Sequence, residues 1–288
     1  MELNTGVLEK MITLIWQSNR ETSWENDWIE YLFRNVPHNT ITDYTQSQIV
    51  NRSLIIYNSL VNNTEYIKKL AAQEISFGLL HLSDEWSRDD TTLYKHTDIV
   101  LRNYYKDLGP TVLNIPLGWI NGYPYDMITR STKDREYVWS FSGHVDKTTR
   151  PEMVKWMSTV PGGESYFKKC GENWGPFQGH ALTPTKLAEM YNDSVFVPCP
   201  QGNQSIDSFR VTEALQAGAI PIVERSKYWS NLFGKDHPLI ELDSWDQVPE
   251  IIANLTQEHT LLEQKRSATY RWWIKYCDNL QNTIKGLL

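Results

Sequence analysis

The sequence has few cysteines and no pattern that would bind a metal ion. Its 288 residues include three cysteines, Cys170, Cys199 and Cys277, which lie far apart and form no Cys-x-x-Cys pair. An odd, widely spaced set predicts neither a zinc site nor a disulfide framework, so we expect reduced thiols. The sequence also has no Asp-x-Asp triplet and no cluster of histidine, cysteine and carboxylate residues at ligand spacing.

Long hydrophobic runs are absent as well. The apolar stretch Met11–Trp16 is followed closely by Gln17 and Asn19, which predicts a first β-strand and not a signal peptide or a membrane span. We therefore expect a soluble, cytoplasmic chain with no transmembrane segment, while a truncated Golgi or secretory form stays open. A glycosylation triplet at Asn203 lies in the loop between the strand expected at 195–197 and the helix that follows, where a glycan would obstruct ligand binding.

Positive charge is not in excess. The formal net charge is −7 and the isoelectric point is near 5.5, which argues against nonspecific nucleic-acid binding. We find no repeat and no low-complexity tract. Aromatic residues are abundant, with 12 tryptophans and 15 tyrosines. Their rings suit stacking on sugars or on a uracil, although packing in a core is the alternative for most of them.

The order of apolar runs predicts an α/β chain, and its length exceeds the usual size of one hydrophobic core. Short runs rich in β-branched residues alternate with helical stretches, which indicates parallel sheets. In the first half we expect strands at 12–16, 54–57, 77–82, 99–101 and 111–115, and helices at 24–35 and 64–72. In the second half we expect strands at 137–141, 195–197, 219–223 and 239–242, and helices at 150–158, 184–191 and 246–254.

A polar segment at 121–135 is the expected linker between two domains. We place the boundary at residue 128, which gives domains of residues 1–128 and 129–270. The last segment, 257–285, carries apolar residues at helical spacing. We expect its final part, a helix at about 270–288, to pack back on the first domain.

The segment from Phe196 to Val223 carries the clearest functional signal. It predicts a strand, a glycine turn, a helix capped by Ser205 or Asp207, and a second buried strand. In such a unit the helix N-terminus lies at the carboxyl edge of the sheet, where anionic ligands bind. Arg210 and Glu213 lie three apart on one helix face, and a guanidinium suits phosphate as a carboxylate suits a ribose diol. An ordinary surface ion pair is the alternative that this spacing leaves open.

Three blocks of sequence resemble the exostosin-like glycosyltransferases. The first has a long, specific pattern made of Gly202, Asp207, Ser208, Arg210, Glu213, Gly218 and residues 220–223. The second comprises residues 81–86, 98–105 and 115–118, and the third comprises residues 139–144 with Arg150. Together they cover residues 75–245 roughly. They are most similar to the branch that holds the ribitol xylosyltransferase and small exostosin-type enzymes of large algal viruses.

This resemblance implies a GT-B fold, in which two Rossmann-like domains face each other across a cleft. It assigns acceptor binding to the N-terminal domain and nucleotide-sugar binding to the C-terminal domain. The donor-binding residues that it implies are Gly143, His144, Arg150, Pro200, Gly202, Asp207, Ser208, Arg210 and Glu213.

We expect no metal and no cofactor, because the Asp-x-Asp triplet that binds manganese in the competing GT-A enzymes is absent. Neutralising the leaving diphosphate then falls to Arg210, to a helix dipole, and to backbone N–H groups near Gly143 and Gly202. Arg150 assists from the start of the next helix in this interpretation.

An inverting transferase also needs a base for the acceptor hydroxyl. Asp84 and Glu85 follow the strand that ends at Leu82, so they lie at its carboxyl end. The alternative is structural: Asp84 caps the next turn, and Glu85 pairs with a nearby arginine. His144 and Asp146 are reserve candidates, and His81, in mid-strand, is expected to be a packed core histidine.

The predicted activity is therefore transfer of a sugar from a UDP-sugar to a hydroxyl of a glycan, without a metal and with inversion. The resemblance points to xylose as the sugar. Two alternatives remain: a GT-B transferase of another donor, such as fucose or glucuronic acid, or a noncatalytic carbohydrate-binding relative.

Overall fold

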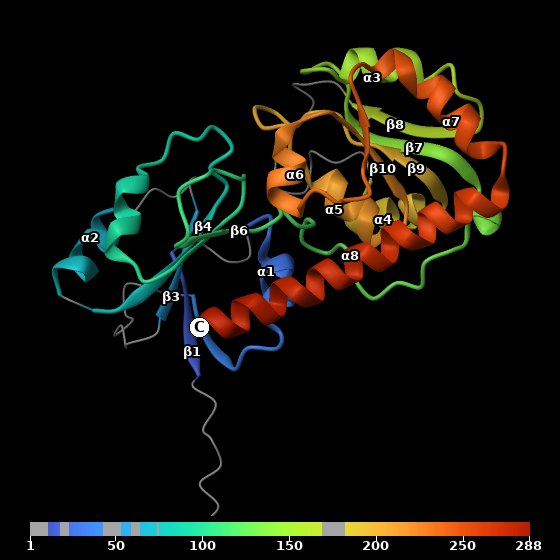
Figure 1. Cartoon of the computed structure of the whole chain (residues 1–288). Helices are drawn as coiled ribbons and strands as arrows, with labels where there is room; N and C mark the ends of the chain where they lie inside the picture. Colours follow the sequence, from blue (N-terminus) through green and yellow to red (C-terminus); the bar gives the residue numbers. More distant parts are fainter. Residues whose placement is uncertain (1–10, 18–22, 43–52, 59–63, 74, 169–181) are drawn as a thin grey trace, which may run out of the picture. The chain divides into compact units, whose positions relative to one another are not determined.

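The computed structural model of the chain describes residues 11–17, 23–42, 53–58, 64–73, 75–168 and 182–288. Cys170 lies outside these residues, whereas Cys199 and Cys277 are buried. The chain divides into two compact units (Figure 1): unit 1 comprises residues 1–115 and 278–288, and unit 2 comprises residues 116–277.

Unit 1 is built on a six-stranded parallel sheet with the strand order β2-β1-β3-β4-β5-β6. The strands are β1 (Ile12–Trp16), β2 (His38–Ile41), β3 (Ser53–Asn58), β4 (Phe77–Leu82), β5 (Val100–Arg102) and β6 (Val112–Asn114). Its helices are α1 (Asn26–Phe33), α2 (Thr64–Ala72) and the short 3₁₀ helix η3 (Thr91–His96). All six residues of β4 are buried, as expected of a central strand in a parallel sheet.

Unit 2 contains a five-stranded parallel sheet with the order β11-β10-β9-β7-β8. The strands are β7 (Tyr137–His144), β8 (Gly163–Lys168), β9 (Ser194–Pro198), β10 (Ile220–Glu224) and β11 (Ile240–Leu242). The helices are α3 (Arg150–Met157), α4 (Pro184–Asn192), α5 (Phe209–Gln216), α6 (Lys227–Phe233), α7 (Val248–Thr256) and α8 (His259–Leu287). Two 3₁₀ turns, η4 (Thr132–Asp134) and η5 (Trp245–Gln247), complete it.

Helices cover both faces of the unit 2 sheet, with α3 and α7 on one face and α4 and α5 on the other (Figure 1). The core under α3 and α7 joins apolar side chains of the strands to those of the helices. Its fully buried members include Phe141, Phe196, Ile222, Met153 and Met157. The predicted α/β class, with a parallel sheet in each half of the chain, is confirmed.

Residues 116–128 belong to unit 2, although the linker composition places the boundary at residue 128. Their contacts explain the difference. The Tyr123 hydroxyl donates a hydrogen bond to the backbone oxygen of Glu213 at 2.7 Å, and the Thr212 hydroxyl donates to the backbone oxygen of Gly118. These bonds attach the polar segment to α5.

Helix α8 contributes to both units. Its residues up to Cys277 belong to unit 2, and the remainder belongs to unit 1, where the Gln281 side chain donates a hydrogen bond to the backbone oxygen of Tyr31 at 3.0 Å.

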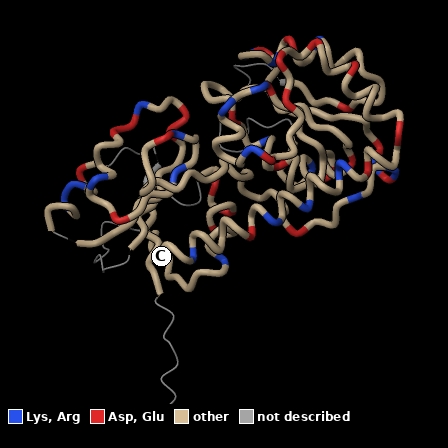
Figure 2. Tube along the Cα trace, viewed as in Figure 1, with Lys and Arg blue, Asp and Glu red and all other residues tan. Residues whose placement is uncertain are grey.

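Charged side chains of both signs are interspersed along the described trace of each unit (Figure 2). That distribution agrees with the absence of a basic stripe from the sequence. Within the described residues, no helix combines the length and apolar composition needed to cross a membrane.

Candidate functional site

The sheet of unit 2 reverses its direction of growth between β7 and β9. The chain moves from β7 outward to β8, and then returns to the other side of β7 to form β9. In open α/β sheets, ligands bind outside the carboxyl ends of the strands at such a switch point. Gly143 and His144 end β7, and residues 199–208 lead from β9 to α5. The structure thus brings the sequence-predicted donor residues of these two segments to one sheet edge.

Arg210, on the first turn of α5, reaches across this switch point. Its Nε and Nη2 atoms donate to the backbone oxygen of Ser142 at 3.2 and 3.1 Å, and its guanidinium lies 4.8 Å from the centre of the Phe141 ring. Among the described residues, no carboxylate forms an ion pair with Arg210. Because a neutral carbonyl and not a carboxylate holds this half-buried guanidinium, its positive charge can pair with an anionic ligand.

Gly143 makes this position of Arg210 possible. Its φ is +141°, and a Cβ atom at this residue would lie 2.3 Å from Nη2 of Arg210. A side chain here would therefore displace the guanidinium. The close approach explains why a glycine occupies the end of β7.

Glu213 is buried one turn further along α5. Burial raises the pKa of its carboxyl to about 7, against the opposing effect of Arg210 and of the Ile120 N–H group, whose nitrogen lies 3.5 Å from Oε1. Because the folded-state pKa lies above the ordinary value of 4.5, the contribution of this carboxyl to stability falls as pH rises from about 4.5 to about 7. The surface ion pair considered from spacing is thus wrong. A buried carboxyl that lowers stability at neutral pH is a candidate functional group.

The predicted caps of α5 are wrong. The helix begins at Phe209, and Ser208 is its N-cap residue. The Asp207 carboxylate accepts a hydrogen bond from the Tyr228 hydroxyl at 2.9 Å, while the Ser205 hydroxyl accepts from the Asp207 N–H group at 3.1 Å. The Ser208 hydroxyl is buried and has no hydrogen-bond partner in the described structure. It is therefore available at the helix N-terminus beside Arg210.

Arg150 lies buried at the start of α3, where it joins two loops of the site. Its Nη1 atom donates to the His144 oxygen at 3.0 Å, and its Nε atom donates to the Gln201 oxygen at 3.3 Å. Thr148 adds a 3.4 Å hydrogen bond from its hydroxyl to the Gly202 oxygen. These contacts fix the loop that contains Pro200 and Gly202, both of which are buried.

Glu224 is a site-forming residue that the sequence does not reveal. Its carboxylate accepts hydrogen bonds from the Gln201 N–H group at 3.1 Å, from the Trp245 indole at 2.6 Å, and from the Thr149 hydroxyl. One carboxylate at the end of β10 thus holds the loop after β9 and the start of α3. Its partners are distant in sequence, so no local pattern could identify it.

In unit 1, Asp84 lies buried just beyond β4 and both of its carboxylate oxygens are engaged. Oδ1 accepts from the N–H groups of Arg88 and Asp89 at 2.9 and 3.3 Å, and Oδ2 accepts from Nη2 of Arg102 at 3.1 Å. This is the turn-capping arrangement that we considered as the alternative to catalysis. Glu85 is half-buried in the same loop and stays a candidate for the base.

His81 is buried in β4, as the sequence predicts. Its Nε2 atom lies 2.8 Å from the Asp89 carboxylate, and its Nδ1 atom is hydrogen-bonded to the Tyr94 hydroxyl. Ligand atoms of His81, Asp84 and Asp89 lie within 4.8 Å of one another. The neighbouring Arg102 guanidinium disfavours a metal ion among them, because it already supplies positive charge to Asp84.

Glu25 is a second site residue that sequence reasoning missed. The buried carboxylate accepts hydrogen bonds from the hydroxyl of Ser83 at 2.8 Å and from the side chains of Asn103 and Ser23, each at 3.3 Å. Burial raises its pKa. These bonds join the start of α1 to the carboxyl ends of β4 and β5. They also hold Ser83, the first residue of the loop that contains Asp84 and Glu85.

Comparisons with known proteins agree with this architecture. A profile of the family described as RXYLT1 C-terminal domain matches residues 123–288. No curated protein sequence matches the chain.

Solved structures with a similar fold include an α1,3-fucosyltransferase, with 9% identity and a TM-score of 0.51 over 98% of this chain and 93% of that chain. Another is Anabaena Alr3699/HepE in complex with UDP, with 9% identity and a TM-score of 0.51 over 96% of this chain and 100% of that chain. A third is the DNA-modifying enzyme β-glucosyltransferase, with 11% identity and a TM-score of 0.50 over 96% of this chain and 99% of that chain. At these identities the likeness shows the fold alone, and that fold is GT-B.

Proposed function

Because this chain belongs to the RXYLT1 C-terminal domain family, we propose that it is an inverting glycosyltransferase. Its donor in this proposal is a UDP-sugar, with xylose the first candidate, and its acceptor is a hydroxyl of a glycan. The family match and the GT-B fold support sugar transfer. The UDP in the HepE complex supports a uridine nucleotide as the leaving group.

The observation that carries the proposal is Arg210 at the switch point of unit 2, fixed by Ser142 and without a carboxylate partner among the described residues. In the proposed donor complex, Arg210 neutralises the diphosphate together with the N-terminus of α5 and the Ser208 hydroxyl. Glu213 accepts hydrogen bonds from the ribose hydroxyls. Arg150 holds the two loops that enclose the nucleotide.

The proposed reaction is a single displacement. The acceptor oxygen forms a bond to the anomeric carbon, while the bond from that carbon to the diphosphate oxygen breaks and its electron pair leaves with UDP. The acceptor proton passes to a carboxylate of unit 1, which we assign to Glu85. Attack from the face opposite the leaving group inverts the configuration at the anomeric carbon.

Ligand binding gives the direct test of donor class. We expect UDP to raise the melting temperature of the protein, because a ligand present at a hundred times its Kd stabilises the folded state by about 2.7 kcal/mol. A higher melting temperature with GDP but not with UDP would indicate a fucosyl donor. No change in melting temperature with either nucleotide would contradict the proposal. Slow hydrolysis of a UDP-sugar without acceptor would separate an enzyme from a noncatalytic relative.

At pH 8, above the pKa of Glu213, replacing Arg210 or Glu213 by alanine is expected to weaken UDP binding by about 1.5–3 kcal/mol, because each change removes a charged hydrogen-bonding group. Isothermal titration calorimetry measures the change. Arg271→Ala is the matched control, since Arg271 lies exposed on α8 and contacts the Ser267 hydroxyl. UDP affinity equal to that of the parent in both site variants would show that Arg210 and Glu213 are structural residues.

We expect turnover to continue in excess EDTA. The sequence has no Asp-x-Asp triplet, and Arg210 supplies the positive charge that a metal ion gives to the diphosphate in other transferases. The measurement is the initial rate with and without the chelator. Complete loss of activity that manganese restores would refute the metal-independent mechanism.

A further inference from the structure

Trp86 differs from the other tryptophans that the structure describes. Its side chain is 47% exposed, and no other described tryptophan is exposed to that degree. Burying an indole ring is strongly favourable in water, so leaving one at the surface forgoes a large apolar contribution. An aromatic side chain held at the surface beside a candidate base is available for a ligand.

The loop that presents Trp86, residues 83–89, is fixed by buried groups. Asp84 binds the N–H groups of Arg88 and Asp89, and the Ser83 N–H group donates to the Asn103 side chain at 2.9 Å. Ser83 and Ser87 have φ values of +68° and +51°, which cost free energy for residues other than glycine. A surface aromatic residue on so constrained a loop loses little conformational entropy when it binds a ligand.

Charge around the ring defines the class of ligand. The Arg88 guanidinium lies over the Trp86 ring, 4.4 Å from its centre. The adjoining sequence also places Glu85, Asp89 and Asp90 in or next to this loop. Charges of both signs surround the ring, with Lys68 and Lys95 near Asp90, so the loop has no excess of positive charge that would favour a phosphate or a uronate. Sugar hydroxyls, in contrast, hydrogen-bond well to both carboxylates and guanidinium groups.

We propose that Trp86 and Arg88 form the acceptor subsite, which takes a neutral sugar ring of the acceptor glycan. The apolar face of the sugar stacks on the indole, and Arg88 donates hydrogen bonds to sugar hydroxyls. This proposal rests on the proposed glycosyltransferase function, since it assigns the acceptor end of that reaction. It places acceptor recognition in the same loop as the candidate base Glu85.

A printed array of oligosaccharides tests the subsite. The array holds neutral β-linked xylo-, galacto- and gluco-oligosaccharides beside uronate-bearing and phosphate-bearing ones. We expect the parent protein, saturated with UDP, to bind neutral oligosaccharides. Trp86→Ala should weaken that binding by at least about tenfold and Arg88→Ala by about threefold to tenfold, as for residues central to a binding site. Trp86→Phe, which keeps an aromatic face, should retain most of the affinity.

Lys155→Ala is the matched control, because Lys155 lies 4.6 Å from the centre of the Trp156 ring on α3 of unit 2. It should bind the array like the parent. UDP affinity, measured in parallel on all variants, tests the proposed function separately and should not change in the Trp86 and Arg88 variants. The subsite is refuted if the parent binds no neutral oligosaccharide, if it binds acidic ones alone, or if Trp86→Ala and Arg88→Ala bind like the parent.

Discussion

Turnover is expected to fall by about 10²–10⁴ when Glu85 is replaced by glutamine, while affinity for the UDP-sugar stays near the parent value. Glutamine keeps the size and most hydrogen bonds of glutamate but cannot accept a proton. We propose Glu85 before Asp84, because both oxygens of Asp84 already accept hydrogen bonds from Arg102 and from the loop backbone. The measurement is the steady-state rate together with donor affinity for each variant.

Asp84→Asn is the paired variant for this experiment. It removes the negative charge that compensates the buried Arg102 guanidinium. Loss of one partner of a buried ion pair typically destabilises a protein by about 3–5 kcal/mol. We therefore expect a lower melting temperature with turnover largely retained in the molecules that stay folded. Should Asp84→Asn abolish turnover in a stable protein, the base is Asp84; near-normal turnover in both variants would direct attention to His144 or Asp146.

Strands buried on both faces could be predicted from the sequence, whereas two polar edge strands could not. Residues 12–16 and 77–82 are predicted with the observed bounds, because central parallel strands have nearly continuous apolar sequences. β2 and β8 were missed. Each lies at an edge of its sheet, and their sequences, His-Asn-Thr-Ile and Gly-Glu-Ser-Tyr-Phe-Lys, show no apolar run. An edge strand pairs on one side, so burial constrains its sequence less.

The candidate site shows the same division between local and long-range information. The glycine turn and the spacing of Arg210 and Glu213 are local, so the sequence predicts a helix that carries both residues at a strand end. The contact of Arg210 with the end of β7 joins residues 68 positions apart. Glu25 approaches Ser83 and Asn103 across 58 and 78 positions. Periodicity and turn signals describe neighbours along the chain, and such pairings depend on how the sheet is assembled.

The largest effect on stability is expected at Arg135, which is buried just before β7. Its Nη1 atom donates to the backbone oxygens of Tyr191 and Ser194 at 3.1 and 2.6 Å, and Nη2 donates to those of Ala217 and Gly218 at 3.1 and 2.9 Å. These carbonyls lie at the C-terminal ends of α4 and α5 and at the strands that follow. Carbonyls at helix ends lack partners within the helix, so one guanidinium satisfies groups from two helices.

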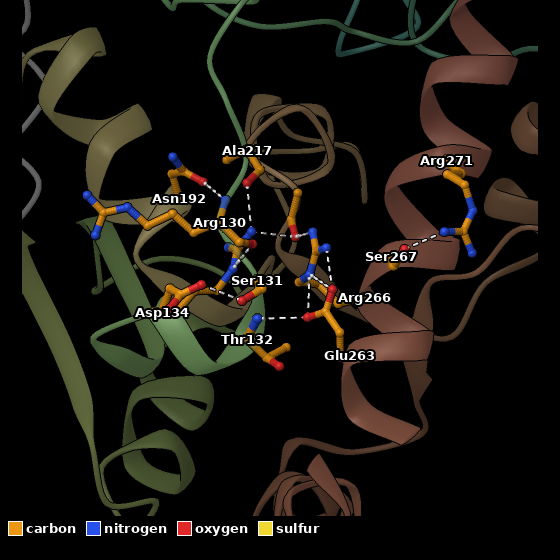
Figure 3. Close-up of polar contacts among 12 residues, drawn as sticks. Arg130, Ser131, Thr132, Asp134, Asn192, Ala217, Glu263, Arg266, Ser267 and Arg271 are labelled. Atoms are coloured by element: carbon orange, nitrogen blue, oxygen red, sulfur yellow. Dashed lines mark hydrogen bonds and ion pairs between the residues drawn. The ribbon is translucent and has the colours of Figure 1, made fainter. Parts of the chain in front are cut away.

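A second arginine supports the same region. Arg266 on α8 lies 3.5 Å from the Gly218 oxygen and pairs with Glu263, whose carboxylate also accepts the Thr132 N–H group at 2.7 Å (Figure 3). This pairing lowers the pKa of Glu263 to about 2. Burial and the nearby Arg266 charge lower the pKa of Arg135, so its bonds to the carbonyls must offset both costs. The cluster lies at the amino ends of β7, β9 and β10, opposite the edge that carries Arg210.

Replacing Arg135 by methionine should therefore lower the free energy of unfolding of unit 2 by about 3–5 kcal/mol, because several buried carbonyls lose their donor at once. Arg135→Lys should lower the free energy of unfolding less, since an ammonium group keeps the positive charge and has three hydrogen-bond donors. Arg130→Met is the control: the Arg130 side chain is 52% exposed in its pair with Asp193, and exposed pairs contribute about 0–1 kcal/mol.

Urea unfolding followed by tryptophan fluorescence measures all three variants. UDP affinity well below the transition should match the parent, because the donor site lies at the other edge of the sheet. The prediction fails if Arg135→Met lowers the free energy of unfolding no more than Arg130→Met does. That result would show that the carbonyls find other partners, such as water, and that Arg135 does not hold α4 and α5 in place. Reduced UDP affinity in folded Arg135→Met would instead show that the two edges of the sheet are coupled through α5.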